Sequence, residues 1–159
     1  MVGESESVKV VIEQWHADSD EIDVESPWAD HIEGDLYQLK NFPFYAYGIS
    51  FDDIFEARVK YDDDDRPYVG RVVEKSGHHT IRAGFDDSLD ESEHTKMVVE
   101  HLADMGCGYE GFGGKKNFVI NVQPHVDYNE VCDFLNDNIV AWEHGDPPGG
   151  DWFVAKTDS

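Results

Sequence analysis

The chain has 159 residues and a formal net charge of −23, because 35 Asp and Glu stand against only 12 Lys and Arg. Binding to nucleic-acid phosphates or to an anionic membrane needs clustered basic side chains, so this composition argues against both partners. No apolar run approaches the roughly 20 residues that span a bilayer, and residues 1–7 lack the features of a signal peptide. With two cysteines and no export signal, we expect reduced thiols and a cytoplasmic protein.

Asp outnumbers Glu by 21 to 14, only 8 Lys are present, and the acidic residues are spread along the whole chain. This pattern is typical of haloarchaeal cytoplasmic proteins, in which molar salt shortens the Debye length to about 3 Å and screens the repulsion between carboxylates. The alternative is an acidic decoy, an immunity or mimic protein that blocks a basic partner by charge complementarity. A decoy concentrates its charge on one face, whereas salt adaptation spreads it over all exposed faces.

Residues 8–76 predict a small, mostly β, barrel-like unit. Segments rich in β-branched and aromatic residues indicate five strands: 8–14, 24–33, 36–39, 51–60 and 66–75. Residues 16–21 are expected to form a loop, and the acidic run 62–65 a tight turn. Pro27 makes the second strand a bulged or edge strand, because proline cannot donate a hydrogen bond to a sheet.

Residues 77–145 predict the order β-α-β-β-α-β of a ferredoxin-like unit, with both helices on one face of a four-stranded antiparallel sheet. The expected strands are 79–85, 107–112, 118–122 and 139–143. The first helix is expected to begin within 88–93 and to stop at Gly106, and the second to carry an apolar stripe along 128–135. Glycines 113 and 114 are expected to form a hairpin turn. With residues 1–7 and 146–159 as flexible or extended ends, the predicted fold class is α+β.

Several segments resemble a known family. Residues 27–29, the run 36–48 (LYQLKNFPFYAYG) and Asp53 look like the first half of the bacterial and archaeal family catalogued as domain of unknown function 4265. Residues 72–82 (VVEKSGHHTIR) are similar to its central Ser-Gly-His segment, and residues 106–111 (GCGYEG) match its turn after a helix. The resemblance covers nearly the whole chain, but it implies no activity, because the family has none to transfer.

The border between the two units is the place where we expect a ligand site, because clefts form preferentially there. Six residues are candidates to line it: Tyr45, Tyr47, Asp53, Ser76, His78 and Arg82. The two tyrosines share one face if their segment is extended, although packing of this aromatic segment in the core is the commoner role. Arg82 is one of only four Arg, so an anionic ligand would find few other partners. Residues 74–80 bring Ser, His and Glu together in sequence, but a triad is recognised by its geometry, so we assign no catalytic residue.

We expect no metal, nucleotide or other cofactor. His94 and His101 are seven residues apart and do not form the usual i, i+4 ligand pair on a helix. The two cysteines lack the close spacing of a zinc site. The glycine-rich run 106–114 follows a predicted helix, whereas a phosphate-binding loop precedes one.

Three functions are compatible with these observations. The favoured one is a non-catalytic binding or regulatory module that contacts another protein or a second copy through the helix-free face of its sheet. The second is a small-ligand receptor or enzyme with its site at the border between the units. The third is the acidic decoy.

Overall fold

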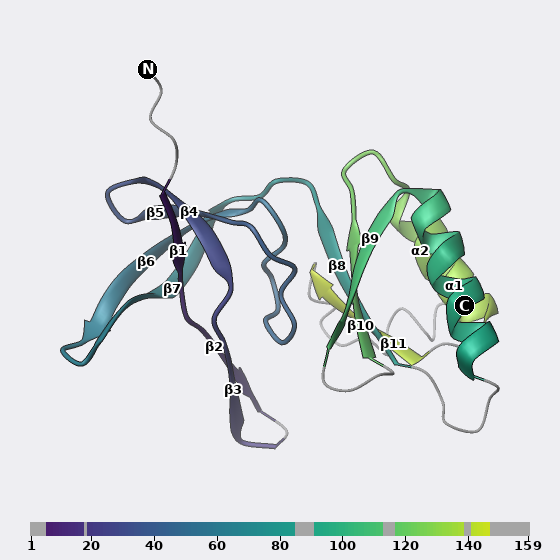
Figure 1. The fold of residues 1–159 in the computed structure, drawn as a ribbon, viewed down its shortest axis with the longest axis horizontal. Coiled ribbons are helices and arrows are strands. Elements are labelled where there is room, and N and C mark those ends of the chain that lie inside the picture. Colours follow the sequence, from purple (N-terminus) through teal and green to yellow (C-terminus); the bar gives the residue numbers. More distant parts are fainter. Residues whose placement is uncertain (1–5, 18, 85–90, 113–116, 139–140, 147–159) are drawn as a thin grey trace.

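The computed structural model of the chain describes residues 6–17, 19–84, 91–112, 117–138 and 141–146. Within these residues, eleven strands form three antiparallel sheets, and two helices complete an α+β fold that is mostly β. Figure 1 shows β1–β7 on one side of the molecule and β8–β11 with both helices on the other. We call these the N-terminal part (residues 6–78) and the C-terminal part (residues 79–146).

A five-stranded sheet forms most of the N-terminal part, with strands in the order β1-β4-β5-β6-β7. Their bounds are β1 (Glu6–Lys9), β4 (Trp28–Glu33), β5 (Leu36–Leu39), β6 (Ile54–Tyr61) and β7 (Asp64–Glu74). Val11 donates its N–H to the Pro67 carbonyl at 2.9 Å and accepts the Val69 N–H at 2.8 Å. The chain after β1 therefore pairs with β7 at the opposite edge of the sheet. Leu39 and Phe55 belong to the buried core of this part.

The strands β2 (Ile12–His16) and β3 (Glu21–Glu25) form a separate two-stranded ribbon. The prediction of one strand over residues 8–14 is therefore wrong, since the chain leaves one sheet at Val10 and enters the ribbon at Ile12. The prediction of a loop over 16–21 is wrong at its ends, because His16 and Glu21 pair with each other. The predicted strand over 24–33 is two strands, because Pro27 has no N–H to continue the ribbon.

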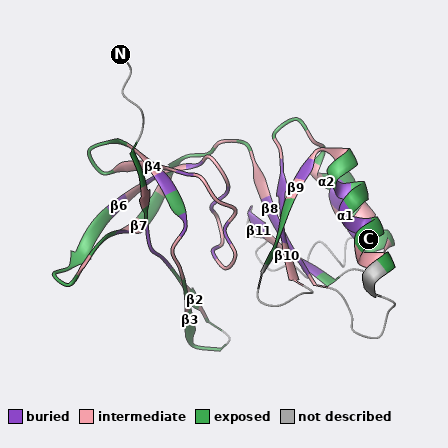
Figure 2. Ribbon diagram, in the orientation of Figure 1, coloured by how far each residue is buried: buried purple, intermediate pink, exposed green. Residues whose placement is uncertain are grey.

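The C-terminal part contains the predicted element order β-α-β-β-α-β. Its elements are β8 (His79–Gly84), α1 (Glu91–Met105), β9 (Cys107–Phe112), β10 (Asn117–Val122), α2 (Tyr128–Asp137) and β11 (Ala141–Asp146). The strands follow the order β11-β8-β10-β9, and Figure 1 shows both helices on the same side of this sheet. Residues such as Ile81, Val98 and Leu135 form a core between sheet and helices (Figure 2).

Some predicted features lie outside the described residues. These are the start of the first helix before Glu91, the turn at residues 113 and 114, residues 139 and 140, and most of the predicted ends. Three residues of the predicted ends are described and lie in strands. Glu6 and Ser7 belong to β1, and Asp146 is buried as the last residue of β11.

The sheet face opposite the helices is partly covered by the N-terminal part. Side chains alternate along β8, so Thr80 and Arg82 point away from the helices. Residues 41–53 pack against this face, and the Gly48 N–H donates to the Gly145 carbonyl at 2.8 Å. The expectation that this whole face is an open partner surface is therefore wrong. The long aromatic segment between β5 and β6 occupies it.

Candidate functional site

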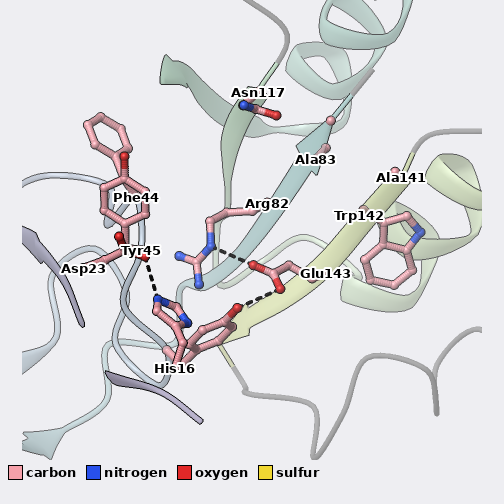
Figure 3. Close-up of a pocket in the computed structure, with 12 residues that line it drawn as sticks. His16, Asp23, Phe44, Tyr45, Arg82, Ala83, Asn117, Ala141, Trp142 and Glu143 are labelled. Atoms are coloured by element: carbon pink, nitrogen blue, oxygen red, sulfur yellow. Dashed lines mark hydrogen bonds and ion pairs between the residues drawn. The ribbon is translucent and has the colours of Figure 1, made fainter. Parts of the chain in front are cut away.

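A pocket of about 400 Å³ lies where the two parts meet, and both parts contribute to its walls (Figure 3). The N-terminal part supplies His16, Asp23, Phe44, Tyr45 and Tyr47. The C-terminal part supplies Arg82, Ala83, Gly84, Asn117, Ala141, Trp142 and Glu143. We call this cavity the junction pocket. Three of the six predicted site residues, Tyr45, Tyr47 and Arg82, line it.

The aromatic wall of the junction pocket is held in place by the β2–β3 ribbon. The Glu25 carboxylate accepts backbone N–H groups from Phe44 and Tyr45 at 2.8 Å each, and from Ala46 at 3.1 Å. The Gln14 side-chain oxygen accepts the Tyr47 N–H at 3.0 Å. The segment has no regular secondary structure of its own, so these side-chain acceptors replace the hydrogen bonds of a strand.

Arg82 forms the floor between the two parts and is only 5% exposed. Its Nε donates to Glu143 Oε2 at 3.3 Å, and its Nη1 donates to the Pro43 carbonyl at 3.2 Å. The guanidinium carbon lies 4.7 Å from the centre of the Tyr47 ring, a cation–π contact. A Cβ at Gly145 would lie 3.1 Å from that carbon, so the glycine leaves the space that the guanidinium occupies. The remaining nitrogen, Nη2, is buried without a hydrogen bond.

Glu143 connects the tyrosine and the arginine of this group. The Tyr47 hydroxyl donates to Glu143 Oε1 at 2.7 Å. Burial, together with this hydrogen bond to a carboxylate, raises the pKa of Tyr47 to about 12. Tyr47 therefore stays protonated near neutral pH and acts as a donor. On the ribbon side, His16 Nε2 lies 2.7 Å from Asp23 Oδ2, an ion pair when the imidazole is protonated.

Asp53 and Ser76 do not reach the junction pocket. Asp53 is fully buried and accepts N–H groups from Ser50 at 2.8 Å and Ser76 at 2.7 Å. Lys75 Nζ lies 2.5 Å from Asp53 Oδ2 and 2.5 Å from Asp146 Oδ2. The role of these residues is therefore structural. Asp53, just before β6, and Asp146, at the end of β11, both contact Lys75, just after β7.

His78 lines a different pocket, of about 410 Å³, on another side of the junction. Its Nδ1 lies 2.9 Å from the Asn121 amide nitrogen, and its ring meets the edge of Phe51. The predicted group of six residues is thus divided among the junction pocket, the buried Asp53 cluster and the His78 pocket. The shared border made the prediction plausible. Of the six residues, however, only Arg82 lies in a strand, and the loops that carry Asp53, Ser76 and His78 place these side chains away from the junction pocket.

The sequence interpretation missed Glu143, His16 and Asp23. The position of Glu143 beside Arg82 could have been predicted, because the first and last strands of the predicted four-stranded sheet are neighbours. In the structure Glu143 pairs directly with Arg82. His16 and Asp23 carry no such signal, because the sequence predicts a loop over residues 16–21 and a strand that begins only at residue 24.

Two further observations concern possible ligands. Among the described residues, no group of three or more His, Cys, Asp or Glu side chains is arranged to hold a metal ion. Neither α1 nor α2, the helices of the described part of the chain, is long and apolar enough to cross a membrane.

The fold and the junction pocket define an α+β protein with a ligand-sized cavity between its two parts. The sequence profile of the family described as domain of unknown function (DUF4265) matches residues 25–144, so the chain belongs to this family, as its segments predicted. The crystal structure of a hypothetical protein from Neisseria gonorrhoeae is similar, with a TM-score of 0.73, 14% identity, and coverage of 90% of this chain and 96% of that one. This likeness shows the fold alone. None of the curated proteins compared with the chain matches it.

Proposed function

We propose that the protein is a non-catalytic cytoplasmic binding module and that its ligand occupies the junction pocket. The observation that carries this proposal is the composite wall, in which three aromatic residues of the N-terminal part face the Arg82–Glu143 pair of the C-terminal part. Ligand pockets are concave, mostly apolar and equipped with a few placed polar groups. The ligand is a small molecule or a side chain of a partner protein.

The polar groups of the pocket support binding rather than covalent chemistry. The described residues that line it include no Ser, Thr, Cys or Lys. Tyr47 and Arg82 are both bonded to Glu143, and the raised pKa of Tyr47 opposes its use as a base. These groups orient one another and leave no free nucleophile beside a free base.

A fragment screen with a pocket-filling variant tests the proposal. Ala141 is exposed and lines the pocket, so Ala141→Trp fills the cavity without removing any residue of the Arg82 group. The control is Ala103→Trp, at an exposed position of α1 outside the pocket. We expect ligand-observed NMR to find fragments that bind the wild type and the control but not Ala141→Trp. Fragments that bind all three proteins equally, or no binding fragment at all, would refute the proposal.

We also infer the finer architecture. The pairing of Val11 with β7 supports an incompletely closed barrel in the N-terminal part. The strand order β11-β8-β10-β9, with both helices on one side, supports a ferredoxin-like C-terminal part.

For the charge we propose salt adaptation, as in a haloarchaeal protein, rather than a decoy surface. Exposed carboxylates lie on both parts of the molecule. They include Asp20, Glu33, Asp62, Asp63 and Glu74 in the N-terminal part, and Glu100, Asp104, Glu130, Asp133 and Asp137 in the C-terminal part. A decoy would gather such groups on one face.

A further inference from the structure

We propose that the junction pocket binds an uncharged carbonyl compound, whose oxygen accepts a hydrogen bond from Arg82 Nη2. The inference rests on the proposed function and names the ligand class of the same site. It replaces the expectation of an anionic ligand that the sequence attached to Arg82.

Arg82 Nη2 is a buried donor without an acceptor. The side chain is only 5% exposed, and its other two nitrogens are bonded, Nε to Glu143 at 3.3 Å and Nη1 to the Pro43 carbonyl at 3.2 Å. The described residues provide no acceptor for Nη2. A buried donor that is left unsatisfied is unfavourable, most of all on a charged group. An oxygen bound at Nη2 therefore supplies the hydrogen bond that the protein does not.

The unsatisfied donor belongs to the junction pocket and is held in a fixed direction. Arg82 lines the pocket, and Figure 3 shows its guanidinium between Glu143 and the segment that carries Tyr45. The Tyr47 ring covers one face of the guanidinium at 4.7 Å, and its bonds to Glu143 and Pro43 fix the plane in which Nη2 lies. Because Nη2 is covered, a ligand oxygen reaches it when a lining side chain rotates aside.

The charges around this donor favour an uncharged acceptor. Glu143 supplies one negative charge for the positive charge of Arg82, although it bonds only Nε. The N–H groups of a guanidinium radiate from one small plane, so an anion at Nη2 would lie near the Glu143 carboxylate and be repelled. Asp23, 46% exposed, adds a second carboxylate, which His16 offsets only when its imidazole is protonated. A carbonyl oxygen accepts the same hydrogen bond without adding charge.

The remaining walls of the pocket fit the uncharged part of such a ligand. Ala83, Gly84 and Ala141 are small residues without polar side chains. A few placed polar groups in an otherwise apolar cavity are typical of small-molecule sites. A cation is a poorer match than a carbonyl compound, because its N–H groups are donors and cannot bond to another donor. The pocket volume of about 400 Å³ admits a one-ring ketone or amide.

The affinity test compares acetophenone with benzoate, two probes of similar size that carry a ketone and a carboxylate on the same ring. Dissociation constants are measured by NMR titration of the full chain at one fixed ionic strength. We expect acetophenone to bind at least about fivefold more tightly, because two like charges about 4 Å apart repel by that factor even in bulk water. Asp23→Asn should reduce this preference, while Asp62→Asn, at an exposed position on the distant β6–β7 turn, should not.

The hydrogen bond itself is tested by isotope-edited infrared spectroscopy of acetophenone labelled at its carbonyl carbon. A donor on the oxygen lowers the carbonyl stretching frequency, so bound acetophenone should absorb at or below its frequency in water. In Arg82→Met/Glu143→Leu the frequency should rise toward its value in hexane. Replacing the ion pair as a unit avoids leaving one charge buried without a partner. The wild-type spectrum decides the question by itself if this variant does not fold.

Four results would overturn the carbonyl assignment: no binding of acetophenone, equal binding of benzoate, a bound stretch at the hexane frequency, or undiminished binding to Ala141→Trp. Ala103→Trp should bind acetophenone as the wild type does. The proposed function fails separately, when the fragment screen finds nothing that Ala141→Trp excludes. Fragments that fill the pocket in a screen where acetophenone does not bind would refute the carbonyl assignment alone.

Discussion

Arg82 on β8 and Glu143 on β11 occupy directly paired positions of the C-terminal sheet, and Arg82 Nε lies 3.3 Å from Glu143 Oε2. Their side chains project from the face opposite the helices, where they meet Tyr47 and the Pro43 carbonyl of the N-terminal part. One cross-strand pair therefore contributes both to the contact between the parts and to the floor of the junction pocket.

Glu143→Gln should destabilise the protein measurably. The amide keeps the shape of the side chain but leaves the buried Arg82 without its counter-charge. Breaking a fully buried pair costs about 3–5 kcal/mol, and because Glu143 is partly exposed we expect about 1–3 kcal/mol. Urea denaturation measures this loss. Glu56→Gln, which removes the exposed pair with Arg71, serves as the control and should leave the midpoint unchanged. Equal midpoints for Glu143→Gln and wild type would contradict the assigned role.

Gly145→Ala should also destabilise the protein. The added Cβ would lie 3.0 Å from Thr80 Cγ2 and 3.1 Å from Arg82 Cζ, so Thr80 or the guanidinium must shift by a few tenths of an ångström. Gly70→Ala is the matched control in another strand, because its nearest contact is an ordinary 3.5 Å to the Glu56 carbonyl. We expect the melting temperature to fall for Gly145→Ala and to stay level or rise for Gly70→Ala, since alanine restricts the unfolded chain. A larger fall in melting temperature for Gly70→Ala than for Gly145→Ala would show that Arg82 does not need the space left by Gly145.

The C-terminal part was predictable from sequence because its signals are local. The apolar stripe of α2 and the glycine after α1 lie within one or two turns of the residues they organise. The N-terminal part was harder, because Val10 and Val11 read as the middle of a strand. Their burial and their bonds to Pro27 and Pro67 depend on contacts distant in sequence. Local propensity cannot report such long-range pairing.

The site was only partly predictable for a related reason. Tyr45, Tyr47 and Arg82 were identified from residue type and from their place near the border. Asp53 and His78 lie outside the junction pocket because of the way their side chains point once the two parts pack, and the sequence does not give that direction. The ion-pair partner of Arg82, Glu143, lies 61 residues away on β11, so the local sequence does not reveal that this guanidinium is paired.

Lys75→Met should destabilise the cluster that joins β11 to the N-terminal part. The ammonium lies 2.5 Å from both Asp53 and Asp146, whose side chains are buried, so its loss leaves two carboxylates without compensation. We expect a loss of about 3 kcal/mol at pH 7. Lys96→Met on the exposed surface of α1 is the control. A Lys75→Met protein as stable as the control would contradict the structural role of the cluster.

Removal of salt should weaken the fold. A change from 1 M to 0.01 M salt lengthens the Debye length from about 3 Å to about 30 Å, so repulsion among exposed carboxylates acts across much of the surface. We expect the melting temperature to fall on dilution. The fall should be smaller for Asp62→Asn/Asp63→Asn, in which two adjacent exposed charges are removed. Identical melting temperatures in molar and millimolar salt would contradict salt adaptation.

His144 should make stability sensitive to mild acid. It lies on β11 within hydrogen-bonding reach of the Tyr128 hydroxyl, and burial lowers its pKa, although nearby Glu143 opposes that shift. The unfolded chain, with a histidine pKa of about 6.5, therefore binds the proton more readily than the folded protein. Stability contributed by neutral His144 is complete above that value and is lost as the pH falls toward the lower, folded-state pKa. Urea titrations between pH 7 and pH 5 should show a shallower decline for His144→Gln than for wild type. His125→Gln, at an exposed position, should follow the wild type, and equal slopes for all three proteins would exclude His144 as the titrating group.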